Sequence, residues 1–166
     1  MAQSISIYGR EELIATPLSS PITLDGRILN GPVLIIDSEA RRTLGNHIGW
    51  GQSTNANRVE QGGCMVGDIF EFNGSYFGLV RDFIPAATQG TSVSLDITAE
   101  MWQEMQAIAG GRNVIGWYHT HPEHGIFMSG TDMNTQRAQF AKDWQFALVA
   151  NPHTLHSWGM KQPHVT

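Results

Sequence analysis

The stretch NVIGWYHTHPEHGIFMSGTD, residues 113–132, combines a strand pattern with side chains that bind metal ions. Residues 113–121 are rich in β-branched and aromatic side chains, which predicts a central strand. Residues i and i+2 of a strand point to the same face, so His119 and His121 would present two imidazoles side by side at its end. Pro122 favours an extended conformation at His121 and ends the strand there.

A third ligand is available from Asp132, in the first turn of a helix predicted over residues 129–143. Two nitrogens, a carboxylate oxygen and a water make a tetrahedral site with an open position, the pattern of catalytic zinc. Each part has an ordinary interpretation by itself: an isolated HxH is a weak indication of metal, and Ser129 with Asp132 also resembles a capping box. Together, in this order and spacing, they favour a zinc site.

A metal hydrolase also needs a general base, and Glu60 is the best candidate. It is predicted to begin a glycine-rich strand, EQGGCMVG (60–67), in which Gly62 and Gly63 leave room for another backbone or a substrate. By itself Glu60 would be interpreted as a surface acid. Ser129 is expected to donate a hydrogen bond to the developing oxyanion.

Two helices are predicted besides the one that carries Asp132. The first is capped by Ser38, runs to about residue 48 and buries one face. The second is capped by Thr98, runs to about residue 109 and buries a similar face. The side chains expected on these two faces are Ala40, Leu44 and Ile48, and then Trp102, Met105 and Ile108/Ala109.

Strands are predicted on both sides of these helices. Residues 33–37 indicate a buried strand or the start of the next helix, and residues 64–72 and 75–84 flank Asn73-Gly74, a strong hairpin signal. Residues 146–150 and 155–161 are predicted to close the sheet. The order of elements predicts an α/β sandwich, with a mixed sheet and helices against its faces.

Composition restricts the class of protein. With 166 residues, 41% hydrophobic and 15% charged, the chain fits a single globular domain. The net charge of −5 and the lack of a Lys/Arg cluster argue against nucleic acid or an anionic membrane as the main partner. Cys64 is the single cysteine, so no internal disulfide forms. Neither a secretion signal nor an apolar run of about 20 residues is visible, and a cytoplasmic protein is expected.

Three motifs, E-x-x-G-x-x-x-G, H-x-H-P and S-x-x-D with six residues between the proline and the serine, resemble the signature of the JAMM (MPN+, JAB) zinc metalloproteases. The segment SGTDMNTQ also resembles the same region of proteasomal and signalosome deubiquitinases. The resemblance implies a cytidine-deaminase-like MPN sandwich with one zinc ion per chain, held by His119, His121 and Asp132. It implies that Glu60 moves a proton from water to the leaving amine and that Ser129 stabilises the tetrahedral intermediate.

The resemblance also implies a substrate, the amide bond after the C-terminal tail of a ubiquitin-like protein, cut in deconjugation or precursor processing. Of two insertions common in the family's deubiquitinases, the first is short here (83–95) and the second is absent after Asp143. The small size resembles bacterial or archaeal stand-alone members, several of which accompany ubiquitin-like conjugation genes, including antiviral defence operons. His124 and Trp117 are the predicted substrate contacts.

The predicted catalytic domain covers residues 33–166, and residues 1–32 form an N-terminal extension of strand and loop without a counterpart. Two alternatives stay open. The domain could be a binding module for a ubiquitin-like tail or a partner MPN-type subunit, with its zinc closed by a fourth protein ligand such as Glu123 or His124. It could also be an amidase for another substrate on the same scaffold.

Overall fold

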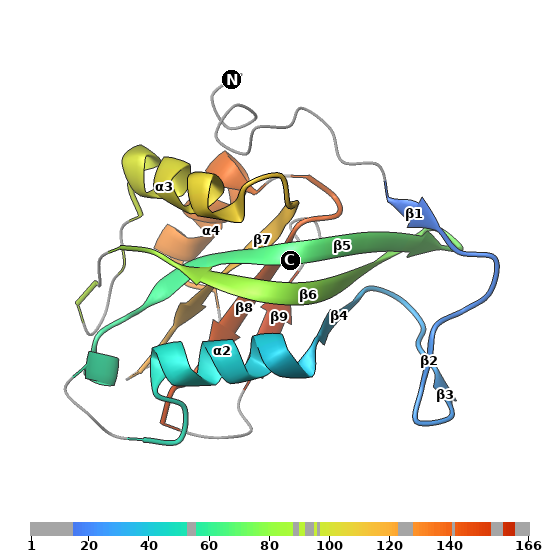
Figure 1. Ribbon diagram of the computed structural model, residues 1–166, viewed down its shortest axis with the longest axis horizontal. Helices are drawn as coiled ribbons and strands as arrows, with labels where there is room; N and C mark the ends of the chain where they lie inside the picture. The colour runs from blue at the N-terminus through green and yellow to red at the C-terminus, as the bar shows by residue number, and fades with distance from the viewer. Residues whose placement is uncertain are drawn as a thin grey trace.

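A mixed β-sheet forms the centre of the fold in the computed structural model (Figure 1), which describes residues 15–52, 56–87, 90–91, 95, 97–122, 128–140, 142–153 and 158–161. Its strands are β1 (Thr16–Pro17), β4 (Val33–Ile36), β5 (Gly62–Phe72), β6 (Ser75–Pro85), β7 (Val114–Thr120), β8 (Phe146–Ala150) and β9 (Trp158–Lys161). They pair in the order β4-β6-β5-β7-β8-β9, with β1 beside β5. Three pairs, β1–β5, β4–β6 and β7–β8, are parallel and the others antiparallel, which confirms the predicted mixed sheet.

The β5–β6 hairpin turns at Asn73 and Gly74, as predicted. Both residues have positive φ angles, 52° and 81°, which an Asn-Gly pair adopts readily in a tight hairpin turn. The two glycines of the E-x-x-G-x-x-x-G motif, Gly63 and Gly67, lie on β5 against β6. A Cβ atom at either one would collide with a backbone carbonyl of β6, at Ile84 or at Leu79 respectively. These glycines therefore permit the close pairing of β5 with β6.

Helix α2 (Ser38–Ile48) covers one face of the sheet (Figure 1). It buries Ala40, Leu44 and Ile48, as predicted. The predicted cap was wrong by one residue, because Asp37 follows β4 directly and its carboxylate accepts the N–H of Glu39 at 2.8 Å. Ser38 is therefore already inside the helix.

Helices α3 (Ala99–Ala109) and α4 (Gly130–Gln139) cover the opposite face (Figure 1). Thr98 caps α3 as predicted, and Trp102 and Met105 are buried. Ala109 takes the next buried position, so Ile108 turns to solvent with 63% of its surface exposed. The helix predicted over residues 129–143 stops at Gln139, and the chain turns before β8.

The N-terminal part of the described chain contributes little to the sheet. Within the predicted N-terminal extension, Thr16–Pro17 forms β1 and pairs with β5. Strands β2 (Thr23–Leu24) and β3 (Arg27–Ile28) form a separate small hairpin. None of the helices in the described ranges has both the length and the apolar character needed to cross a membrane.

Candidate metal centre

Strand β7 presents its side chains alternately to the two faces of the sheet. Tyr118 packs in the core cluster under α2, whereas Trp117 packs in the cluster under α3 and α4. His119 shares the face of Trp117, and its ring stacks on the indole. His121 lies just beyond the end of β7, where its N–H donates to the Ala150 carbonyl at 2.9 Å and keeps the chain extended. The two imidazoles therefore lie next to each other, 4.9 Å between ring centroids.

The start of α4 brings the carboxylate to these imidazoles. Ser129 is the N-cap residue, and its Oγ accepts the Asp132 N–H at 3.2 Å. In return, Oδ2 of Asp132 accepts the Ser129 N–H at 2.8 Å. The capping box and the ligand position thus exist together, because the reciprocal bonds fix the carboxylate at the helix start.

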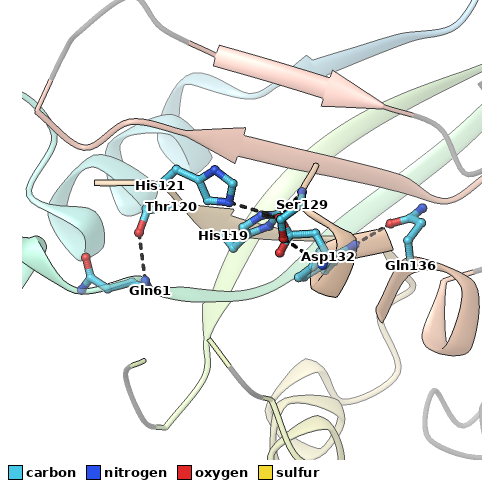
Figure 2. A network of polar contacts seen from close by, with 8 residues as sticks. Gln61, His119, Thr120, His121, Ser129, Asp132 and Gln136 are labelled. Atoms are coloured by element: carbon cyan, nitrogen blue, oxygen red, sulfur yellow. Dashed lines mark hydrogen bonds and ion pairs between the residues drawn. The ribbon is translucent and has the colours of Figure 1, made fainter. Parts of the chain in front are cut away.

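The three side chains converge on one point (Figure 2), and their ligand atoms all lie within 4.8 Å of one another. Nε2 of His119 and Nε2 of His121 are each 3.1 Å from Oδ2 of Asp132. Tetrahedral zinc with bonds of 2.0–2.1 Å places neighbouring ligand atoms about 3.3 Å apart. The two separations between histidine and aspartate are close to that value, and the third lies within 4.8 Å, so the three side chains suit one metal ion.

The surroundings of His119 and Asp132 favour the protonation states that a metal needs. His119, His121 and Asp132 expose 1%, 2% and 7% of their surface. Burial lowers the pKa of His119, which favours the neutral imidazole. Burial opposes ionisation of Asp132, but the hydrogen bonds from His119 and His121 and the Ser129 N–H together hold the pKa of its carboxyl below the usual range. A neutral His119 and an ionised carboxylate suit zinc.

Glu60 lies beside this centre, just before β5 rather than on it. Its N–H donates to the Thr91 carbonyl at 2.6 Å, and its own carbonyl accepts the Gly90 N–H at 2.9 Å. Only 3% of Glu60 is exposed, so it is not a surface acid. Burial raises the pKa of its carboxyl to about 7, an effect that the charge of His121 partly offsets and that of Asp132 reinforces.

Thr120 lies between the two histidines, at the end of β7, and is hydrogen-bonded to Gln61, the residue after Glu60 (Figure 2). Its Oγ1 accepts the Gln61 N–H at 2.9 Å, and its own N–H donates to the Gln61 carbonyl at 2.8 Å. Thr120 is fully buried. Two hydrogen bonds therefore fix the Glu60 segment relative to the histidines.

Replacing Thr120 by valine should destabilise the protein, because the buried Gln61 N–H loses its acceptor. An unsatisfied buried donor costs about 1–3 kcal/mol. Urea denaturation of the metal-free protein measures this loss, and Thr120→Ser, which keeps the hydroxyl, is the matched control. Equal stability of the valine and serine variants would show that the side-chain bond is unimportant.

Trp117 is almost completely buried, which argues against the predicted substrate contact. Its side chain is 3% exposed and stacks on His119 beneath the site. Its indole N–H donates to Oε1 of Gln136 at 2.6 Å. Gln136 was missed in the sequence, although its position one turn after Asp132 places it on the same face of α4. His124 and Glu123 lie outside the described residues, so their roles stay predictions.

A buried His-His-Asp cluster on an α/β sandwich, with a buried acid beside it, is the residue set of a metal-dependent hydrolase. The chain belongs to the JAB1/Mov34/MPN/PAD-1 ubiquitin protease family, whose model matches residues 36–142. The matched range contains Glu60, Ser129 and all three candidate ligands.

Relatives include COP9 signalosome complex subunit 5 of Debaryomyces hansenii, 30% identical over 57% of this chain and 21% of the relative. Ubiquitin carboxyl-terminal hydrolase RPN11 of Saccharomyces cerevisiae is 33% identical over 48% of this chain and 27% of the relative. The chain thus matches less than a third of either relative's length. A solution structure of a protein from Desulfitobacterium hafniense matches with a TM-score of 0.48 and 16% identity, over 78% of this chain and 81% of that one.

Proposed function

We propose that this protein is a zinc-dependent peptidase or isopeptidase that cleaves the amide bond after the C-terminal tail of a ubiquitin-like protein. The observation that carries the proposal is the buried His119–His121–Asp132 cluster with Glu60 beside it. Membership of a ubiquitin protease family supports the substrate class, as does the name of the yeast relative, a ubiquitin carboxyl-terminal hydrolase. Deconjugation and precursor processing both involve this bond.

His119, His121 and Asp132 would hold the zinc ion, which when bound polarises the scissile carbonyl and lowers the pKa of a water molecule. Glu60 takes a proton from the attacking water and returns it to the leaving amine. A carboxyl with a pKa of about 7 can both accept and donate a proton near neutral pH. Burial of Glu60 therefore suits it to this role.

Ser129 is proposed to stabilise the oxyanion of the tetrahedral intermediate. Its Oγ already accepts the Asp132 N–H, which fixes the oxygen at the edge of the cluster. A hydroxyl that accepts one hydrogen bond still has its own hydrogen to donate. A single donor of this kind is worth about 3–4 kcal/mol in other hydrolases.

The short segment after β6 supports the base. Ala86 donates to the Gly62 carbonyl at 2.8 Å, and Gly90 and Thr91 bond to Glu60. We propose that the protein acts in the cytoplasm on a ubiquitin-like conjugation system. Such systems, including antiviral defence systems, accompany stand-alone bacterial members of the family. The extended tail of the substrate would add a strand at an edge of the sheet.

The alternative of a non-catalytic module with structural zinc requires a fourth protein ligand. Within the part of the chain that the structure describes, the cluster contains three such residues only. Glu123 and His124, the predicted candidates for a fourth ligand, lie outside the described residues, so the cleavage assay decides between the two functions.

Cleavage of reporter fusions tests the proposal. Zinc-loaded protein should cut ubiquitin-like fusions and isopeptide-linked conjugates that end in an intact tail, and should not cut fusions with a truncated tail. A chelator such as 1,10-phenanthroline should abolish the cleavage, and added zinc should restore it. Cleavage that resists the chelator would overturn the proposal. So would a zinc-containing protein that cleaves no fusion at all, and this second result would favour a binding module.

A further inference from the structure

The face of α4 that packs on the sheet has a row of mostly polar buried side chains. Its buried side chains, among those that the structure describes in residues 130–140, are Asp132, Gln136 and, at the C-cap, Phe140. They are four residues apart, so they lie on one face of the helix. No aliphatic side chain shares this row in the described part. Beside Asp132, Gln136 and Phe140 therefore supply the buried side-chain contacts of α4 along this row.

Gln136 makes two buried hydrogen bonds that fix its amide. Its Oε1 accepts the indole N–H of Trp117 at 2.6 Å, and its Nε2 donates to the Phe140 carbonyl at 3.2 Å. Trp117 lies on β7, the strand that carries His119 and leads directly into His121. The bond between Trp117 and Gln136 therefore joins α4, which carries Asp132, directly to β7.

Trp117 passes this constraint on to His119. The indole stacks on the imidazole at a centroid distance of 4.6 Å and an interplanar angle of 16°. The phenyl ring of Phe140 also stacks with the indole, 5.8 Å away at 12°. Trp117 is thus held by two ring contacts and one hydrogen bond, and its plane sets the plane of His119.

His119 lacks the support that most metal-binding histidines have. Such a histidine usually donates its other ring N–H to a carboxylate or carbonyl, which fixes the ring. Nδ1 of His119 is buried without a hydrogen-bond partner in the described part of the chain. Together with the contacts to Asp132 and His121, the flat contact with Trp117 therefore helps to orient the imidazole.

We propose that Gln136 and Trp117 form a positioning pair that sets the geometry of the metal centre. Asp132 and Gln136 share one face of α4, Gln136 holds Trp117, and Trp117 orients His119 against Asp132. The inference rests on the proposed metal centre and adds to it the residues that hold the ligands in register. Loss of either member should loosen the centre although neither touches the metal.

Gln136→Met tests the pair because it keeps the length and helical preference of the side chain but removes both polar groups. Its zinc affinity, measured by competition with a chromophoric chelator, should fall about 10–100-fold, as for other residues that orient metal ligands. Arg137→Met is the matched control, since Arg137 is exposed on the same helix, and it should bind zinc like the wild type.

Cobalt substitution adds a readout that a purely structural role would not change. Cobalt(II) in a tetrahedral site absorbs strongly in the visible range, and a distorted or expanded coordination shell weakens and shifts those bands. The Gln136→Met protein should show this change while its circular dichroism stays that of the wild type. Wild-type zinc affinity and wild-type cobalt bands in a folded Gln136→Met protein would overturn the inference.

A double-mutant cycle with Trp117→Phe shows whether the two residues act as a unit. Phenylalanine keeps a ring against His119 but lacks the N–H. If the pair acts as proposed, the double variant should lose little more zinc affinity than the worse single variant. If the losses of zinc affinity in the two single variants added up in the double variant, the residues would act separately. That result would overturn the proposed pairing even if one variant folded poorly. Absence of zinc from the wild type would instead refute the proposed centre itself.

Discussion

Purified at neutral pH without chelators, the wild-type protein should carry about one zinc ion per chain, and His119→Ala/His121→Ala should carry almost none. The double variant leaves Asp132 as the last of the three ligands, and one carboxylate does not hold zinc against buffer and water. Elemental analysis of both proteins measures the difference. Because the imidazoles are buried beside the carboxylate, their loss also removes two polar partners of Asp132 and leaves it the Ser129 N–H.

His153→Ala is the control for this experiment. His153 is a partly exposed histidine whose Nδ1 contacts the Gln52 carbonyl at 3.0 Å, and it is not part of the cluster. It should keep the full zinc content. If the wild type contained no zinc even after zinc was added back, the cluster would not assemble as a metal site, and the binding-module alternative would become the leading proposal.

The candidate ligand set was predictable because its geometry is local. The two-residue repeat of a strand places His119 and His121 on one face, and Pro122 ends the strand where a loop can return. Asp132 follows ten residues after Pro122 in the first turn of α4, and Ser129 caps that turn. Each step depends on neighbours in the chain, so the sequence determines it.

The supporting residues were not predictable, because they depend on which elements pack together. Alternation puts Trp117 on the face of His119, but only the packing of α4 shows that this face is covered there and that Gln136 receives the indole N–H. The acceptor role of Thr120 likewise depends on the antiparallel register in which Gly62 lies opposite His119. Pairing between distant segments sets these contacts, and no local pattern specifies it.

Glu60→Gln should retain zinc and the fold but lose turnover by about 10²–10⁴-fold, the usual contribution of a general acid–base residue. Glutamine has nearly the same shape and cannot accept a proton from the attacking water. Cleavage of a ubiquitin-like fusion measures the loss, with zinc content determined on the same sample. Glu71→Gln, the same change at an exposed position of β5, should leave turnover unaltered. Full activity of Glu60→Gln would remove Glu60 from its assigned role.

The metal-free proteins give an independent test of the environment of Glu60. Its carboxyl has a pKa of about 7 in the fold against an ordinary value of 4.5, because burial disfavours its charge. A raised pKa means that the carboxyl's contribution to stability is complete below pH 4.5 and is lost as the pH rises through 7. At about 1.4 kcal/mol for each pKa unit, the wild type should lose roughly 3 kcal/mol relative to Glu60→Gln between pH 4.5 and pH 8. Urea denaturation across this range measures the difference. If the difference in unfolding free energy between the two proteins did not change with pH, Glu60 would be solvated. If the difference grows with pH as expected, the fold holds a destabilising carboxylate at the position where the proposed reaction needs a base.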